Sequence, residues 1–150
     1  MAQKITPNLW FNGNAKEAVE FYVSVFPDGK IINTTYYPTE GLADFQQPLA
    51  DKELTMEFEL AGQRFMAINA DSTFKFTEAI SLSIACKDQA EIDYYWSKLS
   101  AVPEAEQCGW CKDKYGLSWQ VVPENTEELL KRPNAFAHMM RMKKIVIADF

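Results

Sequence analysis

The chain has 150 residues, of which 47% are hydrophobic and 13% aromatic, which fits one folded domain and excludes a disordered chain. Its net charge of −6 argues against nucleic acid and anionic membrane surfaces as partners, because neither gains from meeting a negative protein. No apolar run approaches the roughly 18 residues that a membrane span needs, so we expect no membrane-spanning helix. The odd number of cysteines, three, fits a reducing compartment, so we expect the cytoplasm.

The first half of the chain predicts one strand, one helix and three further strands. Asn14, followed by Glu17, predicts a helix with a capping box, and Pro27 ends it. A polar stretch at 38–52 predicts a long loop, which is a candidate lid. Alternating apolar or β-branched residues place the strands at 4–11, 30–37, 53–60 and 64–69.

The second half predicts the same order of elements. Asp88, followed by Glu91, predicts another capped helix. The turn-forming residues of 113–116 predict a hairpin within 107–123. The other expected elements are a strand at 78–86, a strand beginning in 103–107, a short helix at 124–131 and a longer one at 135–148. The tail also holds most of the clustered basic residues, for which a solvated helix face is the expectation and a local basic patch the alternative: Lys131, Arg132, Arg141, Lys143 and Lys144.

An internal repeat links the two halves. Residues 14–25 match 88–99 at a constant spacing, and Gly62 and Phe65 match Gly116 and Trp119 at a shorter one. A longer loop at 38–52 in the first half accounts for that difference. We therefore predict an α+β fold made of paired βαβββ modules, with helices outside and two sheets facing each other across a cleft. The modules are 1–70 and 78–123 of a single domain 1–150, and the tail is 124–150.

Several motifs in fixed order resemble one known family. Among them are Ile-Thr-Pro-Asn-Leu-Trp-Phe-Asn-Gly-Asn-Ala at 5–15, Cys-Gly-Trp at 108–110 and Asp-Lys-Tyr-Gly-Leu-Ser-Trp-Gln-Val-Val-Pro at 113–123. The segments 62–67, 76–81 and 142–145 add to them. The chain resembles the PhnB-like group, often labelled 3-demethylubiquinone-9 3-methyltransferase. This group lies within the vicinal-oxygen-chelate superfamily, which has a glyoxalase/bleomycin resistance/dioxygenase-like fold.

The methyltransferase label finds little support in the residues. A Rossmann-like S-adenosylmethionine site needs a glycine-rich turn after its first strand, so that backbone can approach the cofactor. The six glycines of the chain are widely scattered, and no parallel βαβ pattern opens it. We therefore expect no methyl transfer, since a family label does not decide function.

The resemblance implies a divalent metal held in the cleft from four strand positions. Of the residues that fall there, only Gln120 is a credible ligand, while a metal site usually needs three His, Asp, Glu or Cys donors. Glu57 is a weaker second candidate, and His138, the one histidine, is expected to lie in a tail helix, either at its surface or in its packing. We predict no cofactor, and a divalent metal is disfavoured. The four implied positions hold Thr6 or Pro7, Met66, Ala79 or Ser81, and Gln120.

Cys108 and Cys111 have the Cys-x-x-Cys spacing of redox motifs, but not the structural setting that redox chemistry needs. Redox chemistry needs the first thiol at a helix N-terminus, whereas this pair enters a strand and a turn. Residues three apart on a strand point to opposite faces, which disfavours a disulfide. We interpret both cysteines, and Cys86, as small apolar fillers.

What remains is a cleft suited to a small organic molecule held without a metal. The alternatives are that its lining residues only pack a core or a dimer contact, or that Gln120 and Glu57 build an atypical metal site of a glyoxalase- or dioxygenase-like enzyme. We also expect a homodimer, because a methionine and aromatic face at Phe136, Met139, Met140 and Met142 needs covering. The candidate cleft residues are Thr6, Asn8, Trp10, Met66, Ser81, Ser83, Trp110, Ser118 and Gln120.

Overall fold

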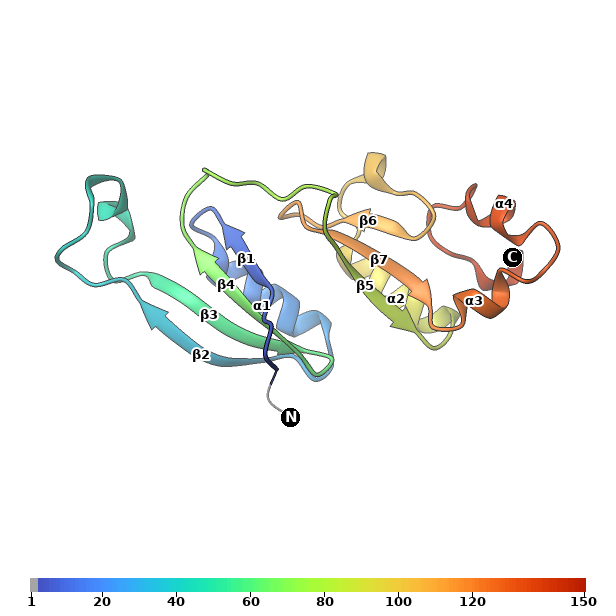
Figure 1. The fold of residues 1–150 in the computed structure, drawn as a ribbon, viewed down its shortest axis with the longest axis horizontal. Coiled ribbons are helices and arrows are strands. Elements are labelled where there is room, and N and C mark those ends of the chain that lie inside the picture. The colour runs from blue at the N-terminus through green and yellow to red at the C-terminus, as the bar shows by residue number, and fades with distance from the viewer. Residues whose placement is uncertain (1–2) are drawn as a thin grey trace. The chain divides into compact units, whose positions relative to one another are not determined.

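The computed structural model describes residues 3–150. They divide into two compact units, the first ending at Lys75 and the second beginning at Phe76 (Figure 1). We describe each unit by itself. Among the described residues, no helix is long and apolar enough to cross a membrane.

The first unit is a four-stranded sheet in the order β1-β4-β3-β2, covered on one face by the helix α1 (Figure 1). β1 runs parallel to β4, and the other neighbours are antiparallel. Along the chain, the elements follow the order of the predicted βαβββ module. Its elements are β1 (Asn8–Phe11), α1 (Ala15–Val25), β2 (Lys30–Tyr36), β3 (Glu53–Leu60) and β4 (Gln63–Asn69).

Strand alternation explains why the helix covers that face. Met56, Phe58 and Leu60 of β3 are buried, whereas the residues between them are half-buried. Phe58 stacks against Tyr22 of α1, with ring centroids 6.3 Å apart. Burying such side chains contributes about 1.5–3 kcal/mol each. At the β3–β4 hairpin, Ala61 and Gly62 have φ of 49° and 78°, the positive values that a tight hairpin turn needs.

Three details of the first unit differ from expectation. The first strand begins at Asn8 rather than at residue 4, because Pro7 has no N–H to donate to a ladder. Asn14 occupies the N-cap but makes no side-chain cap bond; Asn69 Oδ1 accepts instead from the Ala15 N–H at 3.1 Å. The stretch 38–52 is not a loop throughout, since Asp44–Leu49 forms a 3-10 helix.

The second unit is a three-stranded sheet in the order β5-β7-β6, with helix α2 on one face (Figure 1). β5 is parallel to β7, and β6 is antiparallel to it. The Asp88 cap is confirmed, because its Oδ1 accepts from the Glu91 N–H at 2.9 Å. The elements are β5 (Ser81–Cys86), α2 (Gln89–Leu99), β6 (Trp110–Lys112), β7 (Ser118–Pro123), α3 (Thr126–Leu129) and α4 (Ala135–Met139).

The strand predicted from 103–107 is wrong. Pro103–Ala105 is a short 3-10 helix, and only an isolated bridge joins Gln107 to Trp110. Pro103 suits the first position of a helical turn and cannot donate in a ladder. The second sheet therefore lacks a counterpart of β2.

The long helix predicted at 135–148 is also wrong. It ends at Met139, and a 3-10 helix at Ile147–Asp149 follows later. Between them, the carbonyls of Met142 and Lys143 accept from the N–H groups of Cys108 (2.7 Å) and Gly109 (2.8 Å). The tail thus pairs with a distant turn where a helix would have bonded to itself.

Candidate functional site

The predicted cleft residues of the second unit gather on one face of its sheet. The register places Ser81 beside Ser118 and Ser83 beside Gln120 on β5 and β7. On the other side of β7, Trp110 faces Gln120 across the ladder. Because side chains alternate along a strand, all of these lie on the face opposite that of Trp119 and Val121, which are buried.

A hydrogen bond orients Gln120 on this face. Its Nε2 donates to the Ser81 Oγ at 2.9 Å, and both residues are half-buried. Within residues 3–150, no group donates to the Gln120 Oε1, which remains able to accept a bond from a ligand. Ser83 is exposed beside it, whereas Ser118 is only 1% exposed and is buried in the sheet. Of the five residues, only Ser118 is buried; Ser83 is exposed, and Ser81, Gln120 and Trp110 are half-buried.

One ion pair borders the same face. Lys112 lies opposite Ser118 on β6, and its Nζ bonds the carboxylate of Glu78. The hydrogen bond from Lys112 lowers the pKa of Glu78, which is exposed and contributes little to stability. A charged group thus stands next to the amide, hydroxyl and indole groups.

The predicted residues of the first unit are less clearly arranged for binding. Asn8 lies beside Met66 in the register, but its Nδ2 bonds back to the Thr6 carbonyl at 2.8 Å. Trp10 donates from Nε1 to the Asp71 carbonyl at 2.8 Å and meets Phe74 edge to face at 4.8 Å. These contacts occupy Asn8 and Trp10 locally and leave Met66 as half-buried apolar surface.

The donor chemistry does not fit a conventional metal centre. Glu57 is paired with Arg64, Oε1 to a guanidinium nitrogen at 3.1 Å, so a metal would have to break that pair. Gln120 and Glu57 belong to different units. In the part of the chain that the structure describes, no group of three His, Cys, Asp or Glu side chains could hold a metal ion.

The cysteines have a structural role. Cys86 and Cys111 are buried, and Cys108 lies in a turn with φ of 40°. Burial, followed by nearby acidic groups, raises the pKa of Cys86 and of Cys111 to about 12, and burial also raises the pKa of Cys108. A thiol with a raised pKa is a poor nucleophile at neutral pH. Cys86 and Cys111 are buried, as expected of apolar fillers, whereas Cys108 is only half-buried.

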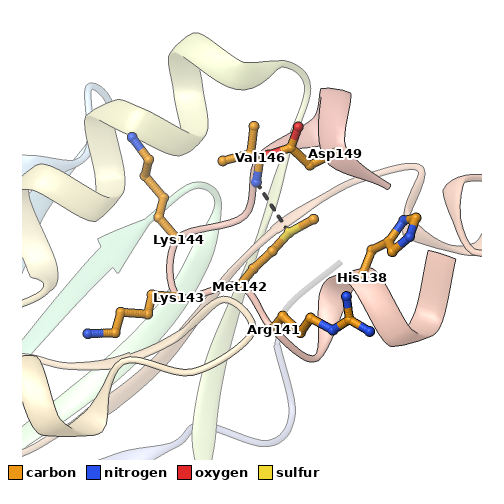
Figure 2. Close-up of a pocket in the computed structure, with 7 residues that line it drawn as sticks. All are labelled: His138, Arg141, Met142, Lys143, Lys144, Val146 and Asp149. Carbon is orange, nitrogen blue, oxygen red and sulfur yellow. Dashed lines mark hydrogen bonds between the residues drawn. The ribbon is translucent and has the colours of Figure 1, made fainter. Parts of the chain in front are cut away.

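The tail forms a pocket that the sequence reasoning missed (Figure 2). Its volume is about 420 Å³. The basic residues of the tail were noted in the sequence, with a local basic patch as the alternative interpretation, but the sequence did not indicate that they line a pocket with His138. The lining residues are His138, Arg141, Met142, Lys143, Lys144, Val146 and Asp149.

Comparison with known proteins gives a consistent family. The family model described as 3-demethylubiquinone-9 3-methyltransferase matches residues 3–122. A solved structure from Bacillus cereus, titled a putative 3-demethylubiquinone-9 3-methyltransferase or PhnB protein, is 35% identical, with a TM-score of 0.64, over 79% of this chain and 97% of its own. No curated protein matches the chain.

A more distant structure shows the fold alone. A protein from Pseudomonas aeruginosa is 22% identical, with a TM-score of 0.60, over 82% of this chain and 98% of its own. The predicted α+β class is confirmed by the two small sheets with their helices and by the match to the Bacillus cereus structure.

Proposed function

The chain belongs to the 3-demethylubiquinone-9 3-methyltransferase-like, or PhnB-like, family, and from that premise we propose that it binds a small organic molecule without a metal. The observation that carries the proposal is the oriented amide of Gln120, held by Ser81 and placed across the ladder from Trp110. An apolar surface with a few fixed polar groups is typical of small-molecule sites.

The ligand class follows from these groups. The half-buried indole of Trp110 offers a flat apolar surface on which a ring can stack. The Oε1 of Gln120 accepts a hydrogen bond, and the exposed Ser83 hydroxyl can donate or accept one. We therefore expect a compound with an aromatic or apolar body and one or two hydrogen-bonding groups.

Methyl transfer is not part of the proposal. The first sheet combines one parallel pair with two antiparallel pairs, and the second combines one of each, unlike the parallel sheet of a doubly wound nucleotide-binding fold. Calorimetric titration with S-adenosylmethionine should give no heat of binding. Saturable heat would contradict the proposal.

A glyoxalase- or dioxygenase-like enzyme with an atypical metal site is the alternative. In its favour, Gln120 stands at a position to which the resemblance assigns a ligand; against it, Glu57 is held by Arg64. Metal analysis of protein purified without chelators distinguishes the two. Stoichiometric metal that is lost in Gln120→Ala would establish the alternative.

A fragment screen by ligand-observed NMR tests the binding proposal directly. In protein-observed spectra, the fragments found by this screen should shift the indole signal of Trp110, and their binding should weaken at least about tenfold in Gln120→Ala. Gln63→Ala is the control, because Gln63 is an exposed glutamine on β4 in the other unit. Equal losses in both variants, or shifts confined to other residues, would rule out this face.

The expected homodimer also remains a proposal, through the face containing Phe136 and Met140. Phe136 is 62% exposed and Met140 43%. Exposed apolar side chains that lie together commonly mark an interaction surface. A second copy of the chain is the partner we propose for this face.

A further inference from the structure

We propose that the tail pocket, defined by His138, Arg141, Met142, Lys143, Lys144, Val146 and Asp149, binds a small compact oxyanion. A phosphate or carboxylate group of a small molecule has the required chemistry. This site lies on the tail and shares no residue with the Gln120 face, so it goes beyond the proposed function. Its volume of about 420 Å³ falls within the range of small-molecule pockets.

The charge of the tail supports an anionic ligand. Between Leu129 and Ala148 the chain has no Asp or Glu, although its net charge is −6. Lys144 pairs with Asp93 at 2.8 Å, which leaves less of its charge for a ligand. Arg141 and Lys143 are exposed, and no carboxylate of residues 3–150 lies within ion-pair distance of either. Their charges are therefore available to a ligand.

Arg141 and His138 stand together on one side of the pocket (Figure 2). The backbone N–H of Arg141 donates to the backbone carbonyl of His138 at 3.1 Å. The two residues are therefore about one helical turn apart, and their side chains project to the same side. Lys143 and Lys144 extend away from them, with Met142 in between (Figure 2). A guanidinium binds an oxyanion through two parallel hydrogen bonds, which makes Arg141 the principal contact.

His138 supplies the second contact. Its Nδ1 is buried, and no described residue forms a hydrogen bond with it. A buried polar atom without a partner is unfavourable, and rotation of the imidazole toward the pocket would let a ligand oxygen bond it and remove that cost. Asp149 is the one acidic residue of the lining, and the basic residues outnumber it. The pocket is therefore positive overall, in an acidic protein.

Titration of the full chain with inorganic phosphate and, separately, with citrate tests the proposal. Amide shifts in NMR should saturate for at least one of them and should be centred on His138 and Arg141. Arg141→Gln should weaken that binding about tenfold or more. Lys131→Gln should change it less than about twofold, because Lys131 carries the same charge in the same stretch but pairs with Glu128 outside the pocket.

The remaining outcomes are decisive. Equal weakening in Arg141→Gln and Lys131→Gln would show a diffuse attraction to a basic segment and would overturn the site. Absence of saturable binding to both anions would also overturn it. Gln120→Ala should leave anion binding unchanged, so this proposal and the binding proposal for the Gln120 face can fail separately. Unchanged thermal unfolding of each variant confirms that it is folded.

Discussion

Gly109 lies directly against Ile145, so closely that a Cβ added to the glycine would stand 3.1 Å from the Ile145 Cγ1. The same Cβ would meet the Val121 carbonyl oxygen at 3.0 Å. Ile145 is fully buried, and the Gly109 N–H donates to the Lys143 carbonyl at 2.8 Å. The Cys-Gly-Trp turn is therefore where the tail closes onto the second sheet.

The first prediction concerns this contact. Gly109→Ala should lower the free energy of unfolding by about 2–4 kcal/mol, because alanine is strained at φ of 88° and its Cβ is crowded by Val121 and Ile145. Gly116→Ala is the control, because Gly116 has φ of 89° but nothing within 4 Å of an added Cβ. It should cost only about 1 kcal/mol. Urea unfolding measures both, and equal losses would show that the contact with Ile145 is unimportant.

A second prediction concerns the carboxylate that organises the β6–β7 turn. Asp113 is 1% exposed, and its oxygens accept from the N–H groups of Tyr115 (2.8 Å) and Leu117 (3.1 Å) and from the Trp119 Nε1 (2.9 Å). In Asp113→Asn an amide N–H₂ replaces one of these acceptors, so we expect a loss of about 2–4 kcal/mol in chemical denaturation. Asp44 is exposed, so the free energy of unfolding of Asp44→Asn should stay within about 0.5 kcal/mol of the parent value. A similarly small effect of Asp113→Asn would contradict the prediction.

A third prediction concerns the buried thiols. Folding raises the pKa of Cys86 and Cys111 from 9.0 to about 12. A group whose pKa is higher in the folded state stabilises the fold fully at pH values below its unfolded-state pKa. That contribution is lost as the pH rises through its folded-state pKa. The urea midpoint should therefore fall between pH 9 and 12, and the fall should be smaller in Cys86→Ala/Cys111→Ala.

Thiol labelling gives an independent check on the same cysteines. At pH 8 the folded protein should react at Cys108 before the two buried thiols, because Cys108 is half-buried and they are buried. All three should react after unfolding. Rapid labelling of Cys111 in the folded protein would contradict its placement in the core.

A fourth prediction locates the dimer contact. Phe136→Lys should shift the protein toward monomer in a concentration series by analytical ultracentrifugation, because it places a charge in the proposed interface. Tyr36→Lys is the matched control: Tyr36 is an exposed aromatic at the edge strand β2, 60% exposed against 62% for Phe136. If Tyr36→Lys alone dissociates the dimer, the contact lies at β2. A parent protein that is monomeric at every concentration would end the dimer proposal.

Local sequence was enough to specify most of the elements. The alternation of β3 and the turn at Ala61 and Gly62 predicted the hairpin to within a residue. The cap at Asp88 predicted the start of α2. These features depend on neighbouring residues along the chain, such as strand period, turn dihedral angles and a side-chain oxygen near an N–H group. The family, too, could be identified from motifs in fixed order.

Contacts between distant residues decided the rest. The side chain of Asn69, and not that of Asn14, accepts a hydrogen bond from the first turn of α1. The N–H groups of Cys108 and Gly109 bind the Met142 and Lys143 carbonyls, which in a longer tail helix would have bonded within the helix. Part of the candidate site followed from strand register, since alternation alone placed Ser83 and Gln120 on one face. Strand register did not predict three other features of the site: the burial of Ser118, the pairing of Glu57 with Arg64 and the pocket beside His138. Each of these depends on where the folded chain brings remote groups together, and periodicity along a sequence carries no record of that.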